Sequence, residues 1–189
     1  MRPLRQLFPW WLKIFIKIVL SRLPVNYQQW KKLKIFKHGD ADDVWSPAKK
    51  FLLHYNAICP EYTPRDYCCL ELGPGDSVAS GIIAKCFGAS RTYLVDVGRY
   101  ATEDLDYYKR FCRELEKNKT SAPDLSKIVS FEELLEVCNI EYLTDGIVSL
   151  RQIPAKSVDF IWSHSVLEHI RRHLFAEVAS EFHRIRGCK

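Results

Sequence analysis

The stretch from Tyr67 to Gly75 constrains the fold of this chain more than any other part. A short apolar run, Tyr67–Leu72, stops at Gly73-Pro74-Gly75, and an apolar helical pattern follows from Val78 to Phe87. A buried strand, a tight glycine turn and a helix in this order are typical of the first unit of a nucleotide-binding α/β sheet. We therefore expect an α/β fold in which the backbone of the turn approaches a ligand closely.

The residues around the turn indicate the charge of that ligand. A dinucleotide fingerprint has a third small residue where Val78 stands here. Asp76 and Glu71 place negative charge beside the turn, which would repel a pyrophosphate but would not repel an ammonium or a sulfonium. The pattern favours a nucleoside that carries an amino acid, and it disfavours the alternative of a nicotinamide-dependent reductase.

Four segments resemble a known family in the order in which that family carries its motifs. Glu71-Leu-Gly-Pro-Gly75 resembles the first motif of the class I S-adenosylmethionine-dependent methyltransferases. Arg91–Asp96 and Ile140–Gly146 look like the ends of the second and third strands. Ser157–His169 is similar to the fourth strand and following helix of the type 11 methyltransferase subgroup, which reads vDxIxSxxVLEH. The resemblance covers roughly Tyr67 to Arg186.

This resemblance implies a Rossmann-like methyltransferase fold, a parallel sheet in a three-layer αβα arrangement, with S-adenosyl-L-methionine as cofactor. It places the amino-acid end of the cofactor at the first turn, the ribose at Asp96, and the adenine at Asp145 and Gly146. Asp96 lies 21 residues after Gly75, and a carboxylate can accept two hydroxyl hydrogen bonds. The cofactor-binding residues implied are Glu71, Gly73, Pro74, Gly75, Asp96, Val97, Asp145, Gly146 and Ser163.

His164 is the candidate catalytic base. Methyl transfer from a sulfonium is a direct displacement, so the protein must align the reactants and take up a proton from a hydroxyl or amine acceptor. His164 follows the fourth predicted strand, at the sheet edge where ligands bind. The alternative is that it only lines the cofactor pocket. Glu168 and His169 are expected to begin the next helix, and no metal site is expected because no third ligand is spaced with His169 and His173.

The first 60 residues are interpreted as a basic, aromatic helical arm, and residues 61–189 as the cofactor-binding domain. Residues 1–38 hold nine of the 28 basic residues and none of the 23 acidic ones. The apolar helical pattern between Pro9 and Pro24 is too short and too charged to span a bilayer. It fits either a helix packed over the sheet or the substrate cleft, or an interfacial helix. Residues 7–37 thus suggest peripheral membrane contact in a cytoplasmic protein, and nucleic-acid binding is not expected.

The arm suggests an anionic or membrane-proximal acceptor, so we expect a small molecule or a saccharide, such as a lipid-linked one. The seven cysteines include no Cys-x-x-Cys pair and are expected to be reduced thiols.

The resemblance implies seven strands, but the sequence supplies four, so we expect a fragment whose Val158–Trp162 strand is a bare apolar edge. Such a chain is expected to be inactive and poorly soluble. The alternative is a non-catalytic, cofactor-binding or scaffold fragment of the same fold.

Overall fold

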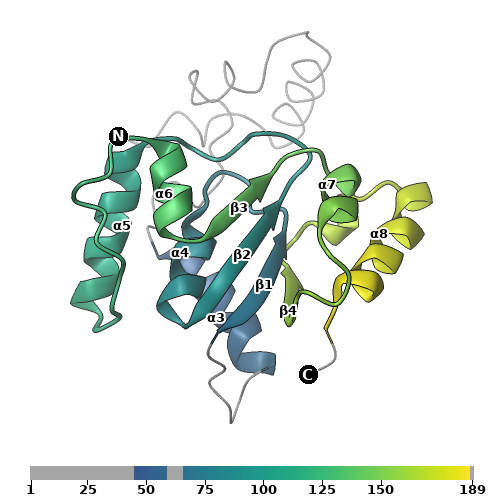
Figure 1. Cartoon of the computed structure of the whole chain (residues 1–189), viewed down its shortest axis with the longest axis horizontal. Helices are drawn as coiled ribbons and strands as arrows, with labels where there is room; N and C mark the ends of the chain where they lie inside the picture. The colour runs from purple at the N-terminus through teal and green to yellow at the C-terminus, as the bar shows by residue number, and fades with distance from the viewer. Residues whose placement is uncertain (1–44, 59–65, 188–189) are drawn as a thin grey trace, which may run out of the picture. The chain divides into compact units, whose positions relative to one another are not determined.

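A four-stranded parallel sheet forms the centre of the protein. The computed structural model describes residues 45–58 and 66–187. The strands are β1 (Tyr67–Leu72), β2 (Ala89–Val95), β3 (Ile140–Leu143) and β4 (Phe160–Ser163). They lie in the order β3-β2-β1-β4, and every neighbouring pair is parallel (Figure 1). The predicted α/β fold with a Rossmann-like parallel sheet is confirmed.

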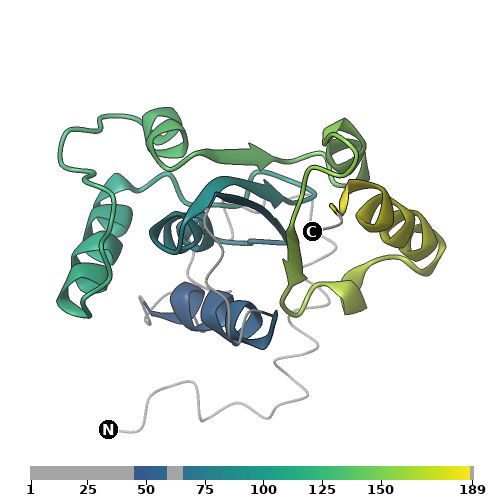
Figure 2. The same ribbon diagram turned by 60° about the horizontal axis from the view of Figure 1, so that its bottom comes forward.

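Helices cover both faces of this sheet and complete the three-layer arrangement (Figure 2). One apolar cluster joins the sheet to α3 (Ser46–Ile58), α4 (Ala79–Cys86), α5 (Leu105–Lys117) and α6 (Phe131–Val137). The other joins it to α7 (Ile147–Gln152) and α8 (Arg172–Ile185). Successive side chains of a strand point to opposite faces.

Strand β1 is buried on both faces because it lies between β2 and β4 under both helical layers. Cys69 packs in the cluster with α3 and α4, whereas Leu70 packs in the cluster with α7 and α8. This explains why the sequence of β1 is a continuous apolar run instead of an alternating one. The chain proceeds outward from β1 to β3 and then returns to place β4 on the other side of β1. The carboxyl ends of β1 and β4 therefore flank a topological switch point, where open α/β sheets bind ligands.

Most helix ends follow local sequence signals, with one correction. The Ser130 hydroxyl caps α6 by accepting from the Glu133 N–H at 3.1 Å. Helix α5 is capped by Asp104, which accepts from two backbone N–H groups. The expectation that Glu168 and His169 begin the next helix is wrong. A 3₁₀ turn, η3 (Leu167–His169), holds Glu168 and His169, and extended backbone at Arg171 separates it from α8.

Helix α3 belongs to the same compact unit as the sheet, which comprises residues 42–189. The predicted boundary at residue 60 lies outside the described residues and stays a prediction. The predictions for residues 7–37, including membrane contact, lie outside the described residues and stay predictions. Among the helices that the structure describes, none has the length and apolar character needed to cross a bilayer.

Strand β4 lies at the edge of the described sheet, as expected, but most of its apolar side chains are buried. Val158, Phe160 and Trp162 are buried, and Ile161 is half-buried. Residues 185–187 run beside Val158, which lies just before this strand. The Val158 N–H donates to the Ile185 carbonyl, and the Val158 carbonyl accepts from the Gly187 N–H. From Phe160 onward the described ladder of β4 is formed with β1 alone.

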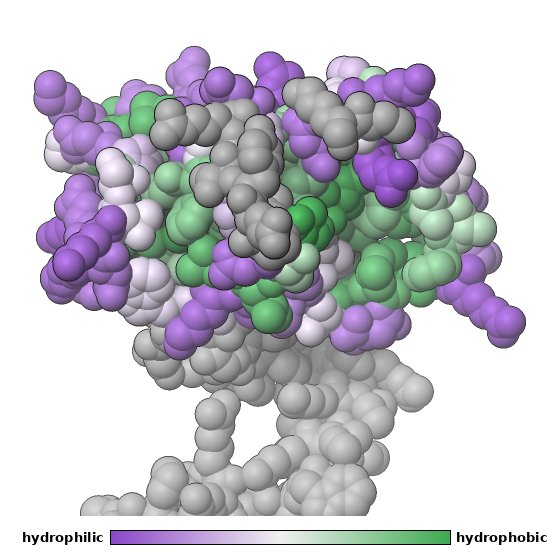
Figure 3. All heavy atoms as spheres, turned by 90° about the horizontal axis from the view of Figure 1, so that it is seen from below, coloured by the Kyte–Doolittle hydropathy of each residue, from purple (hydrophilic) through white to green (hydrophobic). Residues whose placement is uncertain are grey.

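Apolar atoms still reach the surface of the described residues. Viewed from below, the molecule shows apolar areas bordered by hydrophilic side chains (Figure 3). The large apolar side chains that are exposed lie on several elements and loops: Leu53, Ile58, Val97, Val129, Val137, Val148, Leu167 and Phe175. The five cysteines within the described residues are free thiols.

We predict that Tyr108→Phe destabilises the fold. The buried Tyr108 hydroxyl accepts from the Val78 N–H at 3.2 Å and donates to the Thr102 carbonyl at 2.7 Å, so it ties the start of α4 to the loop before α5. Its removal leaves two backbone groups without this partner and should lower the free energy of unfolding by about 1–3 kcal/mol. Urea unfolding measures this change. Ser157→Ala is the control, because the Ser157 hydroxyl makes a similar bond at the surface. Its loss should change the free energy of unfolding by less than about 0.5 kcal/mol. Equal losses in the two variants would contradict the prediction.

Candidate functional site

The turn after β1 has two glycines with different surroundings. Gly73 and Gly75 both have left-handed backbone, with φ values of +78° and +67°. A Cβ atom at Gly73 would come within 2.3 Å of a Val166 methyl group, whereas one at Gly75 would meet none of the described residues within 4 Å. Gly73 therefore permits the close packing of the segment after β4, and Gly75 leaves open space at the carboxyl edge of the sheet. Pro74 lies between them and is half-buried.

Asp96 joins this turn to the end of β2. One carboxylate oxygen accepts from the Gly75 N–H at 3.1 Å, and the other accepts from the Val97 N–H at 2.7 Å. The Asp96 carbonyl accepts from the Gly146 N–H at 2.8 Å. Burial raises the pKa of Asp96 above its ordinary value, the two N–H bonds oppose that shift, and the nearby Asp76 adds to it. Residues from the ends of β1, β2 and β3, which are far apart in sequence, thus meet at one residue, Asp96.

Three amides of the turn and of the start of α4 have partners within the protein. The Gly73 N–H donates to the Val95 carbonyl at 2.8 Å, the Gly75 N–H donates to Asp96, and the Val78 N–H donates to Tyr108. A phosphate bound at a glycine turn relies on backbone N–H groups such as these. The nearby carboxylates of Asp76 and Asp96 would also repel it, although the buried Glu71 adds little to this charge. The geometry therefore disfavours a pyrophosphate at this turn.

An apolar surface adjoins the carboxylate. Val97 is 75% exposed. A Cβ atom at Gly146 would lie 3.1 Å from a Val97 methyl group, so the two residues are neighbours. The adjacent Asp145 donates its N–H to the Ser149 hydroxyl at 2.9 Å, which holds the loop against the start of α7. An exposed valine beside a glycine is a surface on which a flat apolar ring can lie.

Tyr142 is a residue of this site that the sequence did not single out. Its hydroxyl accepts from the Tyr100 N–H at 2.9 Å and from the Ala101 N–H at 3.1 Å, and it lies 3.3 Å from the Gly98 carbonyl. Strand β3 therefore shapes the loop that follows Asp96 and Val97. The available signal was the aromatic residue at the end of a strand next to β2, but its partners could not be read from the sequence.

Glu71 is buried below the turn. The Ser80 hydroxyl of α4 donates to its carboxyl group, and the side chain lies on the sheet face that α4 covers. Burial raises the pKa of Glu71 to about 8, while Ser80 and Lys50 oppose the shift. The carboxyl group is therefore mostly protonated at neutral pH. The predicted contact of Glu71 with the amino-acid end of a cofactor stays a prediction.

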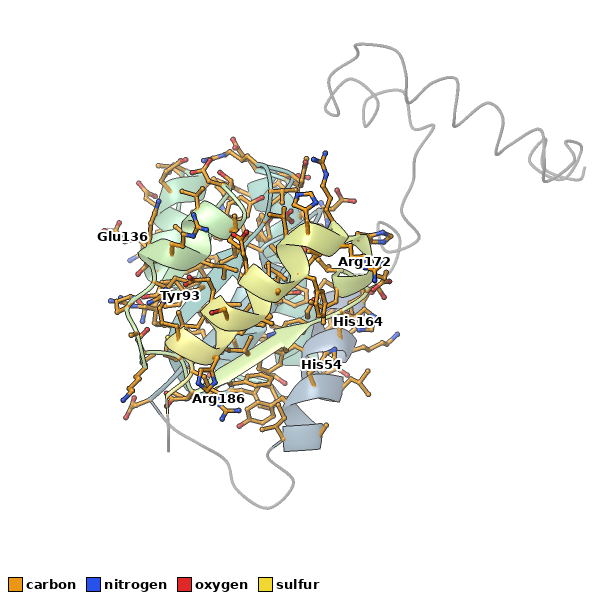
Figure 4. All side chains as sticks on the ribbon, turned by 90° about the vertical axis from the view of Figure 1, so that its right-hand side faces the viewer. His54, Tyr93, Glu136, His164, Arg172 and Arg186 are labelled. Atoms are coloured by element: carbon orange, nitrogen blue, oxygen red, sulfur yellow. The ribbon has the colours of Figure 1, made fainter. Side chains whose placement is uncertain are left out.

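The carboxyl end of β4 presents Ser163 and His164. Ser163 donates its hydroxyl to the Leu72 carbonyl at 3.1 Å, which ties β4 to β1 just before the glycine turn. The His164 Nδ1 atom lies 3.3 Å from the Nε2 atom of His54 on α3. The two ring planes are nearly perpendicular, at 77°, and Figure 4 labels both side chains. His169 and His173 do not form a larger cluster, since no group of three His, Cys, Asp or Glu residues suited to a metal occurs among the residues that the structure describes.

Comparison with known proteins identifies no family for this chain. No family model matches it, and no curated protein matches it. One solved structure is similar, that of a protein of Methanococcus maripaludis described provisionally as an S-adenosyl-L-methionine-dependent methyltransferase. The identity is 13%, the TM-score is 0.45, and the match covers 78% of this chain but 55% of the other, so this chain spans about half the length of that protein. At this level of similarity, function must be inferred from the site itself.

We predict that Gly73→Ala lowers the stability of the fold more than Gly75→Ala does. Both substitutions place a side chain in left-handed backbone, which costs about 1–2 kcal/mol. Gly73→Ala additionally clashes with Val166 and should lower stability further, whereas the added methyl group at Gly75 enters open space. Thermal unfolding should therefore show the larger loss for Gly73→Ala. Equal melting temperatures for the two variants would contradict the described packing of the turn.

We predict that Glu71→Gln changes how stability depends on pH. The pKa of Glu71 is raised in the folded state, so its contribution is complete below the unfolded pKa of 4.5 and is lost as the pH rises to about 8. Across this window the group should lower the free energy of unfolding by about 1.4 kcal/mol per pH unit. Glutamine cannot ionise, so the variant should lose this slope. The free energy of unfolding of the variant, relative to that of the wild type, should therefore be higher at pH 8.5 than at pH 5. Urea unfolding at both values tests this, and parallel pH profiles would contradict it.

Proposed function

We propose that this chain is an S-adenosyl-L-methionine-dependent methyltransferase. The observation that carries the proposal is the Asp96 carboxylate at the carboxyl edge of the sheet, bound to the Gly75 N–H and followed by the exposed Val97. This places a hydrogen-bond acceptor suited to a ribose between an open glycine turn and an apolar surface. Ligands of open α/β sheets bind at this edge.

The residues present fit the three parts of the cofactor. Each Asp96 oxygen accepts one described N–H and has capacity for another donor, so the carboxylate can also accept from ribose hydroxyls. Val97, Asp145 and Gly146 would hold the adenine, with Val97 offering an apolar contact. Gly73, Pro74 and Gly75, with Glu71 below them and Ser163 at the neighbouring strand end, would hold the amino-acid end.

The same features support this cofactor over a nicotinamide dinucleotide. Three amides of the glycine turn are engaged by Val95, Asp96 and Tyr108. Asp76 contributes negative charge nearby, as its effect on the pKa of Asp96 shows. A positively charged amino-acid end is compatible with these acids, whereas a pyrophosphate needs free donors and is repelled by them.

The chemistry asks little of the protein beyond alignment and proton transfer. When bound, the cofactor supplies an electrophilic methyl group. The chain orients the reactants at the switch point, and His164, which follows β4 beside this edge, takes the proton released by a hydroxyl or amine acceptor. We propose a small molecule or a saccharide as the acceptor, an inference that derives from the basic, aromatic residues of the N-terminal arm.

Calorimetry with S-adenosylhomocysteine tests the cofactor assignment. We expect Asp96→Asn to weaken binding about 10- to 100-fold, because a charged hydrogen-bond acceptor is lost at the ribose position. Asp124→Asn is the matched control. Asp124 also accepts a backbone N–H, from Ser126, but in a surface turn between α5 and α6, so the affinity should not change. An Asp96→Asn affinity within about twofold of the wild type would refute the ribose assignment.

A thermal-shift panel separates the proposal from its two alternatives. S-adenosyl-L-methionine and S-adenosylhomocysteine should raise the melting temperature of the wild-type chain, and NADH should not. Stabilisation by NADH alone would favour a reductase. Stabilisation by neither sulfur ligand would favour a scaffold protein that keeps the fold without the cofactor.

A further inference from the structure

Arg99, in the loop after β2, bridges two acidic side chains. Its Nε–H donates to the Glu103 carboxylate at 2.8 Å, and an Nη2–H donates to the Glu132 carboxylate at 3.0 Å. Glu103 belongs to the same loop, whereas Glu132 lies in the first turn of α6, 33 positions along the chain from Arg99. A guanidinium stays charged and can only donate, so the direction of both bonds is certain. Arg99 therefore clamps the loop to α6.

Phe131 extends this clamp into the core. The Arg99 guanidinium lies over the Phe131 ring, with its Cζ atom 5.4 Å from the ring centroid. Phe131 is buried and packs edge-on against Tyr142 of β3, with ring centroids 6.4 Å apart. The Tyr142 hydroxyl in turn accepts from the Tyr100 and Ala101 N–H groups of the same loop. The loop backbone is thus held both by β3 and by the start of α6.

The same loop begins with the apolar surface of the candidate site. Val97 is 75% exposed and lies two residues before Arg99. Gly98, between them, permits a compact turn: a Cβ atom there would come within 2.9 Å of the Tyr100 ring, and the Tyr100 N–H donates to the Gly98 carbonyl at 3.1 Å. Asp96 fixes the Val97 N–H, but the Val97 side chain is exposed. Its position therefore depends on the contacts that hold the residues after it.

We infer that Arg99 is a positioning residue, which holds Val97 in place against the adenine by clamping the loop after β2 to Glu132. This inference rests on the proposed function, in which Val97 offers an apolar contact to the adenine. Arg99 acts through the loop and needs no contact with the ligand. Without the clamp the loop would adopt other conformations, and the apparent affinity would fall with the fraction of molecules whose loop is competent to bind.

A clamp of this kind should affect binding more than folding. The side chains of Arg99, Glu103 and Glu132 are 49%, 56% and 71% exposed, and exposed ion pairs contribute little to the stability of a fold. An ion pair that served stability alone would change the melting temperature and leave the affinity of the folded protein unaltered. The affinity of the folded chain is therefore the property to measure.

Calorimetry with S-adenosylhomocysteine tests the inference. We expect Arg99→Gln to weaken binding about three- to tenfold, and Arg99→Lys, which keeps the charge, to recover part of the loss. The matched control is Arg91→Gln. Arg91 also makes an exposed ion pair, with Glu141 at 3.1 Å, and also lies over an aromatic ring, that of Tyr93. Because Arg91 is near the start of β2, at the opposite edge of the sheet, its variant should bind as the wild type does.

A double-mutant cycle identifies the partner of Arg99. Glu132→Gln should also weaken binding, because it removes the contact between the loop and α6. The double variant Arg99→Gln/Glu132→Gln should bind no more weakly than Arg99→Gln, since both substitutions remove the same contact. Without ligand, the melting temperatures of Arg99→Gln and Arg91→Gln should be similar.

Three outcomes would overturn the positioning role while the wild type still binds. These are an Arg99→Gln affinity within about twofold of the wild type, an equal loss of affinity in Arg91→Gln, and additive losses in the double variant. A much lower melting temperature for Arg99→Gln than for Arg91→Gln would assign Arg99 to the stability of the fold instead. A wild-type chain that binds no S-adenosylhomocysteine would overturn the proposed function, and the positioning role with it.

Discussion

The hydrogen bond between the Asp96 carboxylate and the Gly75 N–H connects the parts on which the site depends. It fixes the turn after β1 against the end of β2 at 3.1 Å, and the same residue binds Gly146 through its carbonyl. Two backbone hydrogen bonds support the turn, one from the Gly73 N–H to the Val95 carbonyl and one from the Thr102 N–H to the Asp76 carbonyl, but neither reaches Gly75. With the bond from Gly75 to Asp96, one acidic side chain both organises the backbone of the site and offers its remaining acceptor capacity to a ligand.

Burial and charge divide the acidic residues of the site into two roles. Glu71 is enclosed under α4 with Ser80, so its raised pKa makes it mostly neutral at pH 7. Asp96 receives two backbone N–H bonds, which favour its charged form and offset part of the effect of burial. A carboxyl group that is buried without such donors takes up a proton, whereas one with them can remain an anion. This difference explains why Asp96, and not Glu71, is the candidate ribose acceptor.

Much of the sheet could be predicted from sequence because its strands are apolar runs with clear ends. The bounds of β1 were read correctly, since Gly73 stops an uninterrupted buried run. The start of α8 was misplaced because the apolar pattern continues through Leu167, and nothing local shows that the backbone is extended at Arg171. Helix α7 was missed because six residues are too few for a periodic signal.

The contacts made by side chains distant in sequence could not be predicted. His54 and His164 are separated by 110 positions, and Tyr142 reaches its partners 41 to 44 positions away. No local pattern marks such pairs, although His54 shares a helix face with Phe51. They are determined by the packing of α3 on β4 and of β3 on β2.

The central claim is that the carboxyl edge around Asp96 binds an adenosyl amino acid. The most direct measurement is an amide proton–nitrogen titration of the wild-type chain with S-adenosylhomocysteine. We predict saturable shifts of the Gly75, Val97 and Gly146 signals, and none at Gly88 and Asn139, which lie at the opposite ends of the strands. Shifts confined to that opposite edge, or no saturable shifts at all, would contradict the account.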